Sequence, residues 1–237
     1  MHRLRLGITI CLAIATAGCV QYSEEIHFNT DGSGWVKARL DVPARFFAGD
    51  TSLSRIISPR IALAELGRKS IQKRILREGV SLRRFETTRG DTVWSWYIEY
   101  YFRDIEAFRR VHGDGHGVSV RKHPRGAYEL EVLFTRPVTH GGVDFMANAE
   151  THPRLVRDLS IIHVFNMPGR VISTPGGRNN GKTARFAWSG KNPASVLRPE
   201  SMRVVFKGTG VDWPVFEALP VEPPNGNRGM YDDYSTD

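Results

Sequence analysis

The chain has very little cysteine, and what it has lies at its start. Cys11 and Cys19 are the two cysteines among 237 residues. A domain with no cysteine in its body cannot be held by internal disulfides, so its stability must come from apolar burial and strand pairing. Apolar and charged residues make up 41% and 24% of the chain. These fractions are typical of globular proteins and exclude wholesale disorder and a multispan membrane protein.

The first twenty residues follow the plan of a signal peptide. Met1 to Arg5 is short and basic, Leu6 to Ala15 is apolar, and small residues precede Cys19. An apolar run of this length is too short to span a bilayer as a permanent helix. Residues 15–19 resemble the bacterial lipobox, although Thr16 stands where leucine is usual. The alternative is an ordinary secretory leader with a chance cysteine.

The lipobox resemblance implies cleavage before Cys19 and a lipid on its thiol. It also implies acylation of the new amino group by a chain such as palmitate. Each buried methylene contributes about 0.8 kcal/mol, and stable membrane residence needs two lipid signals, which such a cysteine provides. The resemblance further implies an outer-membrane destination if the envelope has two membranes, because Val20 is not aspartate.

Alternating apolar residues predict most of the secondary structure as strands. They occur at 20–28 and 36–42, on either side of an Asp31-Gly32 turn, and at 80–88 and 92–102. Further strands are expected near 117–122, 127–135, 159–166, 183–188 and 201–207, with a short helix capped by Asp104.

Residues 52–78 instead carry apolar side chains at helical intervals. The predicted fold class is therefore α+β, a mostly antiparallel sheet with a helical segment of about 52–78 packed on it. We expect a signal peptide at 1–18, one extracytoplasmic domain at 19–212, and a loosely ordered tail at 213–237.

The second part of the predicted helix is basic, within a chain whose formal net charge is +8. Such a face is typical either of a helix on anionic lipid headgroups or of a core-packed helix with a solvated surface. The candidate membrane-facing residues are Arg68, Lys69, Lys73, Arg74 and Arg77.

Residues 92–102 are unusually aromatic. Trp94, Trp96 and Tyr100 share one face of the predicted strand. Such surface must be buried, either in the core or as the lining of an apolar ligand cavity. These three residues are the candidate ligand-lining residues.

Two motifs suggest chemistry that their context does not support. Residues 176–183 match the phosphate-loop pattern, but the segment after Lys182 alternates like a strand where the pattern needs a helix. Residues 112–116 place His112 and His116 around glycines, without a third ligand at metal-site spacing, so an exposed turn is favoured over a metal site. We therefore expect no catalytic residue, cofactor, metal or nucleic-acid partner.

The stretch from Phe165 to Ile172, with its Pro168-Gly169 step, continues through a glycine-rich turn to a strand ending at Trp188. Together with the lipobox and the first hairpin, it resembles the LppM-like bacterial lipoproteins. The resemblance implies a non-enzymatic extracytoplasmic α+β domain that binds envelope lipids or glycolipids. The alternative is a structural or assembly lipoprotein that docks a partner protein in the cell envelope.

Overall fold

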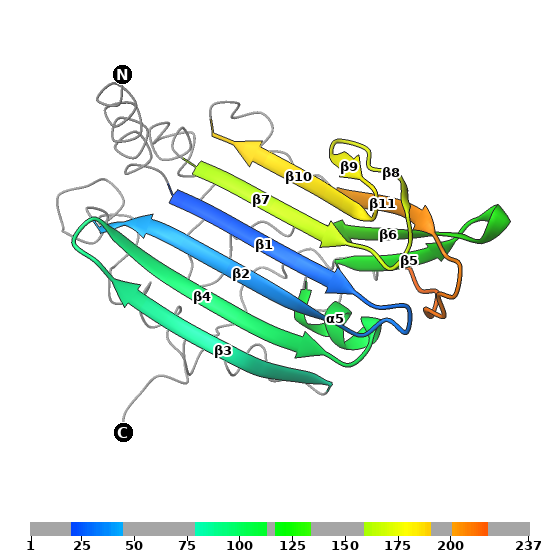
Figure 1. Ribbon diagram of the computed structural model, residues 1–237, viewed down its shortest axis with the longest axis horizontal. Helices are drawn as coiled ribbons and strands as arrows, with labels where there is room; N and C mark the ends of the chain where they lie inside the picture. The colour runs from blue at the N-terminus through cyan, green and yellow to red at the C-terminus, as the bar shows by residue number, and fades with distance from the viewer. Residues whose placement is uncertain (1–19, 45–78, 113–116, 134–158, 191–200, 218–237) are drawn as a thin grey trace, which may run out of the picture.

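Strands follow the period-two patterns through most of the chain that the structure describes. In the computed structural model these residues are 20–44, 79–112, 117–133, 159–190 and 201–217 (Figure 1). The elements in chain order are β1 (Val20–Phe28), β2 (Gly34–Pro43), β3 (Val80–Arg89), β4 (Val93–Phe102), α5 (Ile105–Val111), β5 (Val118–Lys122), a 3-10 turn η3 (Pro124–Gly126), β6 (Ala127–Leu133), β7 (Leu159–Asn166), β8 (Val171–Ser173), β9 (Arg178–Asn180), β10 (Thr183–Ser189) and β11 (Ser201–Lys207).

The described strands form two sheets. One has seven strands in the order β3-β4-β2-β1-β7-β10-β9, and the other has four in the order β5-β6-β11-β8. The pair β1–β7 is parallel, whereas the β1–β2, β2–β4 and β7–β10 pairs beside it are antiparallel. Because a parallel pair cannot be joined by a tight hairpin, the chain passes through β2 to β6 before it pairs with β1 again as β7.

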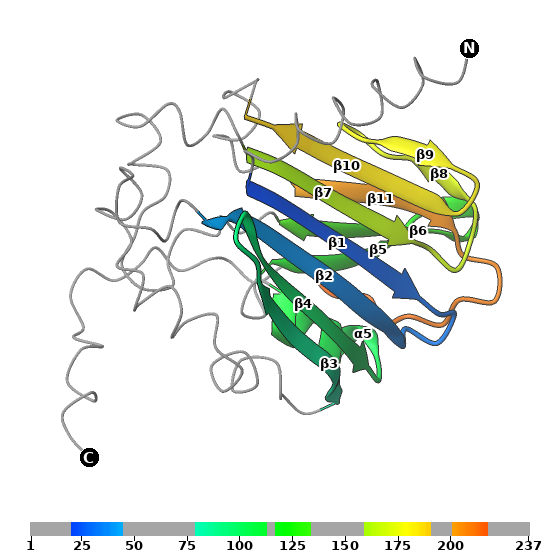
Figure 2. The same cartoon turned by 60° about the vertical axis from the view of Figure 1, so that its left-hand side comes forward.

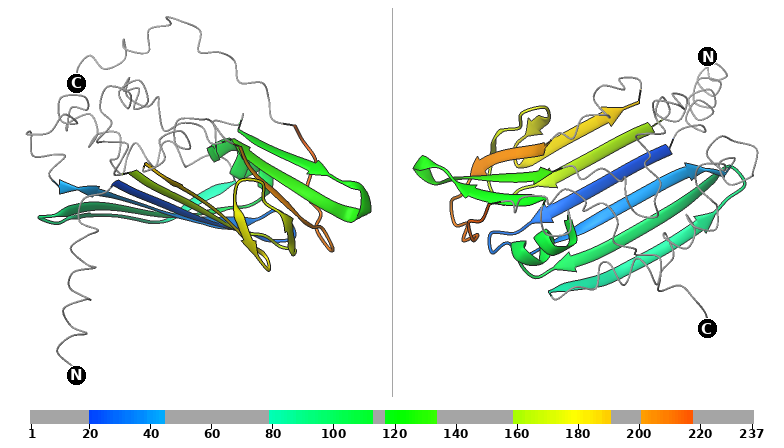
Figure 3. Two further views of the ribbon diagram at one scale, coloured as in Figure 1. Left: turned by 90° about the horizontal axis from the view of Figure 1, so that it is seen from above. Right: turned by 180° about the vertical axis from the view of Figure 1, so that it is seen from behind.

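The four-stranded sheet lies against one face of the seven-stranded sheet, near the C-terminal ends of β1 and β7 (Figures 2 and 3). We call this face the inner face. α5 lies on the same side, close to where β4 ends (Figure 3). A single apolar cluster fills the space between the sheets, and each fully buried large side chain stabilises the fold by roughly 1.5–3 kcal/mol. Its largest members are Phe28, Phe102, Phe108, Phe165, Phe186 and Phe206.

The expected α+β class was wrong. Strands account for 64% of the described residues and helices for 10%, so the fold is mostly β, with two sheets and one short helix. A second sheet covers one end of the inner face, and Val120, Leu130 and Val204 on its strands are fully buried there. The predicted helical segment of about 52–78 lies outside the described residues.

Two local predictions are confirmed. Residues 21–28 pair with 34–41 across the Asp31-Gly32 turn, where Gly32 has φ +82° and the Asp31 carboxylate accepts a bond from the Ser33 amide at 2.9 Å. Asp104 caps α5 through its Oδ1, which accepts a 2.7 Å bond from the Ala107 amide. Both positions show local side-chain chemistry setting an element boundary.

The phosphate-loop pattern lies on a hairpin, as its alternating continuation predicted. β9 pairs antiparallel with β10, with Thr183 opposite Asn180. Gly181 and Lys182 form the two-residue connection, and Gly181 has φ +59°. A phosphate loop requires a following helix whose N-terminus holds the phosphate, and here a strand follows.

The packed part of the chain continues past residue 212, where the tail was expected to begin. Trp213 is buried in the cluster between the sheets, and its indole nitrogen donates to the Asn29 carbonyl at 3.1 Å. Phe216 then bridges to Val120 on β5 through backbone bonds of 2.8 and 3.0 Å. These contacts fasten the segment after β11 to both sheets.

Candidate functional site

Five large side chains form a row across the inner face of the seven-stranded sheet. The strand register places Tyr22 beside Leu40 on β2 and Ile161 on β7. Leu40 is in turn beside Trp96 on β4, and Ile161 is beside Trp188 on β10. Because alternate residues of a strand face the same side, the row is continuous over five strands. We call these five residues the aromatic row.

Trp94 extends this apolar surface toward the tip of the β3–β4 hairpin. Its ring lies 6.4 Å from that of Trp96, and the Arg89 guanidinium lies 5.0 Å over it. We call the aromatic row together with Trp94 the aromatic end. It occupies the end of the sheet where β1 begins and β10 finishes (Figure 1). Among the described elements, the four-stranded sheet and α5 lie over the opposite end (Figure 3).

The aromatic end is separate from most of the closed core. Trp96 and Ile161 are buried but lie outside the cluster between the sheets, and Trp188 is partly buried and packs against that cluster. Trp94 and Tyr22 are half-buried. The inner face thus has a closed part beneath the second sheet and a distinct aromatic part.

A buried carboxylate lies in the row next to the aromatic row. Glu24 is 6% exposed, and its Oε2 lies 2.8 Å from Nδ1 of His163, its neighbour across β1 and β7. Its Oε1 lies 3.7 Å from Nε2 of His112, the residue that ends α5. The same Nε2 lies 2.9 Å from the Tyr100 hydroxyl. With Tyr22, which hydrogen-bonds Glu24, these residues form what we call the Glu24 cluster.

Burial and mutual contact shift the pKa values of this cluster. Burial opposes ionisation of Glu24, but the His112 charge and the His163 hydrogen bond outweigh it and hold the Glu24 pKa below its ordinary value. Burial lowers the pKa of His112, against the opposing pull of Glu24. Burial, then the nearby carboxylate, raises the pKa of Tyr22 well above its ordinary value. At neutral pH Glu24 is therefore ionised, and the Tyr22 hydroxyl keeps its proton.

The cluster and the aromatic row are in direct contact. The rings of Tyr22 and His163 lie 5.6 Å apart, and His163 meets Trp188 edge to face at 5.7 Å. An apolar wall thus adjoins a small polar group on one sheet face. This combination is typical of sites for molecules with an apolar body and a polar end.

Perturbed carboxylates and histidines also occur in active sites, where they act as acids and bases. Such a role requires that a substrate reach the titrating groups, and Glu24 is 6% exposed. A shallow hollow of about 330 Å3 at the junction of β3, β4 and residue 103 shares no residue with the Glu24 cluster. Its lining residues are Gly79, Val80, Ser81, Tyr101, Phe102 and Arg103. The titrating groups of the Glu24 cluster therefore form a buried internal network.

Acidification should destabilise the protein through this cluster. The unfolded chain protonates His112 below its ordinary pKa of 6.5 and Glu24 below 4.5, whereas the folded state resists both because both pKa values are lowered. The stability that they contribute is present above those values and is lost as the pH falls through the folded pKa values. Urea unfolding between pH 7.5 and 4 should show this loss. In His112→Gln the part that begins near pH 6.5 should shrink, and an unchanged profile would contradict the assignment.

The structure brings together only part of the predicted site. Trp94 and Trp96 are neighbours at the aromatic end, whereas Tyr100 lies in the closed core, where its hydroxyl meets His112. Cys19 lies outside the described residues. So do the five candidate membrane-facing residues, Arg68, Lys69, Lys73, Arg74 and Arg77.

Sequence reasoning missed the Glu24 cluster, although the signal was present. Glu24 interrupts the inward-facing apolar series of β1 between Tyr22 and Ile26, and His163 interrupts that of β7 between Ile161 and Phe165. A charged residue at an inward position is costly unless it is paired. Each interruption therefore predicts a partner, but residues 139 apart in the chain cannot be matched without the β1–β7 pairing.

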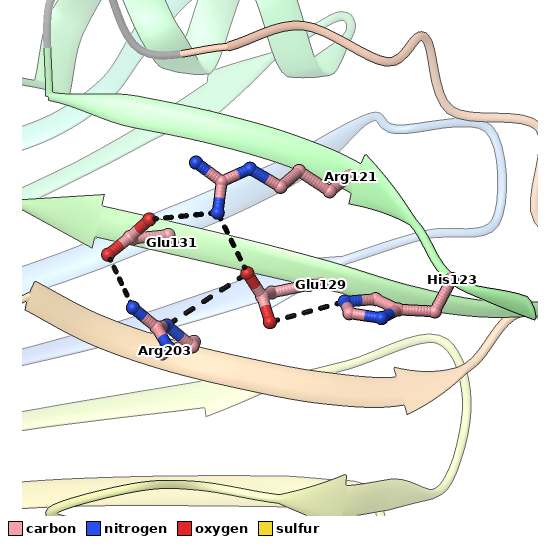
Figure 4. Close-up of polar contacts among 5 residues, drawn as sticks. All are labelled: Arg121, His123, Glu129, Glu131 and Arg203. Carbon is pink, nitrogen blue, oxygen red and sulfur yellow. Dashed lines mark hydrogen bonds and ion pairs between the residues drawn. The ribbon is translucent and has the colours of Figure 1, made fainter.

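A second polar cluster lies on the outer face of the four-stranded sheet (Figure 4). Glu129 lies 3.4 Å from Arg121 and 3.2 Å from His123, and Glu131 lies 3.3 Å from Arg203. Burial opposes ionisation of Glu131, but hydrogen bonds from Ser201 and Arg203 lower its pKa. These charges satisfy one another across three strands, so the cluster stabilises the sheet, by roughly 0.2–1 kcal/mol for each exposed pair.

Two further features bear on the class of protein. Within the described ranges, no group of three or more histidine, cysteine or acidic side chains is placed to hold a metal ion. The helices of those same ranges include none with the length and hydropathy needed to cross a bilayer.

Comparison with known proteins gave distant structural likenesses only. No protein-family model matches the chain, and no curated protein matches it. The folded domain of LppM from Mycobacterium tuberculosis, solved by NMR, is 12% identical, with a TM-score of 0.39 over 80% of this chain and 90% of that domain. Yeast LTA4 hydrolase in complex with bestatin is 5% identical, with a TM-score of 0.31 over 80% of this chain and 28% of the hydrolase.

Proposed function

We propose that this chain is a bacterial envelope lipoprotein, anchored through Cys19, whose aromatic end binds an amphiphilic lipid or glycolipid without catalysis. The observation that carries the proposal is the aromatic row, in which five large side chains cross five strands outside most of the closed core. Large aromatic side chains grouped on one concave or flat face are the usual lining of sites for apolar ligands.

The surroundings of the aromatic row favour an amphiphile over a purely apolar ligand. The Glu24 cluster adjoins one side of the row through the Tyr22 and Trp188 contacts with His163. Arg89 lies over Trp94 on the other side. Acyl chains or other apolar groups would lie against the row, while a headgroup would meet polar groups at its margins.

The membrane anchor is supported by the sequence alone. The basic start, the apolar run and the small residues before Cys19 resemble a lipoprotein leader, with Thr16 in place of the usual leucine. Export follows from the same leader and places the domain outside the cytoplasm. In an envelope with two membranes, Val20 after the cysteine favours the outer membrane.

Removing aromatic rings from the site should weaken amphiphile binding. In Trp94→Ala with Trp188→Ala, the lost apolar contact corresponds to about 1.4 kcal/mol or more, which is a tenfold or larger rise in Kd. A brominated lysophospholipid, titrated below its micelle concentration, provides the measurement through quenching of tryptophan fluorescence.

Trp35→Ala is the matched control, because Trp35 lies on the outer face, stacked on His27 at 5.3 Å. It should leave the affinity within about twofold, since it touches no part of the aromatic end. Equal affinity in wild type and the double variant would reject the proposed site. No saturable quenching in the wild type would reject the proposed function.

A further inference from the structure

The aromatic end lies at the point where the chain would enter its membrane. Cys19 is joined by one peptide bond to Val20, the first residue of β1, so their Cα atoms are about 3.8 Å apart. Val20 begins the strand at the same end of the sheet as the aromatic row, because Tyr22 of that row is only two residues further along. A lipid on Cys19 therefore holds this end of the sheet, and not the other, at the bilayer.

The composition of this end suits the interface between lipid and water. Tryptophan and tyrosine prefer the headgroup level of a bilayer, where a ring meets acyl chains and its polar atom meets water. Trp94 is half-buried at this end, and the exposed Arg89 over it offers a cation to lipid phosphates. The opposite end of β1 instead leads to the turn at Asn29 and Thr30, which are exposed polar residues.

We propose that this end of the seven-stranded sheet, with Trp94 and Arg89 at the β3–β4 hairpin foremost, rests on the bilayer that holds the anchor, and that the strands run away from the bilayer surface. The inference rests on the proposed function, because it needs the lipid on Cys19. The occupant of this surface is the phospholipid headgroup layer of that leaflet. The tip of the β3–β4 hairpin then touches lipid, while the β1–β2 turn stands about 30 Å away, the length of a nine-residue strand.

In this orientation the adjacent leaflet would be the source of the amphiphile that the site binds. A ligand can pass between the leaflet and the aromatic row without crossing open water, because the two surfaces are continuous. An amphiphile with long acyl chains, which is nearly insoluble as a monomer, is therefore the class of ligand that the site would take.

The scarcity of cysteine makes the orientation measurable. Cys11 leaves with the leader and the Cys19 thiol is consumed by the lipid, so an introduced cysteine would be the single free thiol of the mature chain. Asp91→Cys places a fluorophore in the exposed β3–β4 connection, and Thr30→Cys places it in the exposed β1–β2 turn. The labelled, lipidated proteins are reconstituted into vesicles of phosphatidylcholine and phosphatidylglycerol that contain a headgroup-nitroxide lipid.

The label at residue 91 should be quenched several-fold more strongly than the label at residue 30. Equal weak quenching at both positions, stronger quenching at residue 30, or failure of the protein to float with the vesicles would overturn the orientation. The experiments distinguish failure of the bilayer orientation from failure of amphiphile binding. If monomeric brominated lysophospholipid binds but residue 91 stays in water, the orientation is wrong and the site stands. If residue 91 is quenched but no lysophospholipid binds, the orientation stands and the binding function is wrong.

Discussion

Gly34→Ala should lower the free energy of unfolding by about 3 kcal/mol, at the upper end of overpacking effects. A Cβ atom at Gly34 would lie 1.9 Å from the His27 carbonyl oxygen and 2.4 Å from Cζ of Phe102. The carbonyl belongs to the neighbouring strand and cannot move without disturbing the β1–β2 ladder. The Phe102 ring is held by Phe28 and Phe108 at 5.5 and 5.2 Å. Chemical denaturation followed by tryptophan fluorescence measures the change.

Gly90→Ala is the matched control for that substitution. Gly90 lies in the β3–β4 connection, and its added Cβ would lie 3.1 Å from the Val93 carbonyl oxygen, which is tight but adjustable. We expect a change of about 0.5 kcal/mol, as at ordinary surface sites. If Gly34→Ala proved no more harmful than Gly90→Ala, the close approach of β1, β2 and β4 at Phe102 would be wrong.

Glu24→Ala should also cost about 3 kcal/mol, because it removes the acceptor from a buried polar network. The Nδ1 atom of His163 loses its partner at 2.8 Å, and His112 loses the carboxylate that opposes the effect of burial. Glu24→Gln keeps an acceptor oxygen and should lose less. The same denaturation experiment at neutral pH measures both variants.

The adjacent Glu25→Ala tests whether the effect belongs to the buried position. Glu25 points to the outer face, is exposed, and accepts a 2.9 Å bond from Asn166. Its removal should change stability by no more than about 0.5–1 kcal/mol, as for other exposed polar contacts. If Glu24→Ala lowered the free energy of unfolding no more than Glu25→Ala does, the buried Glu24 cluster would not stabilise the fold as proposed.

Local patterns predicted the strands because the alternation of apolar and polar residues within each strand shows which of its faces is buried. The alternation around Trp96 and around Phe165 is read directly from neighbouring residues, and so is the cap at Asp104. These features depend on interactions within a few residues of the chain. The short strands β8 and β9 were missed, because three residues are too few to show a period.

The fold class was wrong because periodicity does not say what covers a sheet. The alternating strands near 117–122, 127–135 and 201–207 look the same whether they extend the first sheet or build a second one. The choice is made by long-range pairing, in which β11 joins β6 and β1 joins β7. The partners are 68 or more positions apart in the first pairing and 139 apart in the second, and pairings at such separations leave no local trace in one sequence.

The candidate site likewise combines residues that can be found within one strand with residues that only long-range strand pairing brings together. Trp94 and Trp96 were found because they alternate on one strand, but their partners Tyr22, Ile161 and Trp188 come from three other strands. Strand register alone joins them into the aromatic row. Tyr100 shares the face of Trp96 but lies four residues along β4, beneath the second sheet, so the same alternation placed it with residues from which the fold separates it.

Native mass spectrometry of the protein purified from its own membrane tests the central claim most directly. We expect a chain that begins at Cys19 and is heavier than its sequence by the mass of two or three acyl chains with glycerol. We also expect one noncovalently bound amphiphile, which is retained in Trp35→Ala and lost in Trp94→Ala with Trp188→Ala. An unmodified Cys19 would contradict the anchor. A bound mass that is absent from the wild type, or indifferent to the two tryptophan substitutions, would contradict binding at the aromatic end.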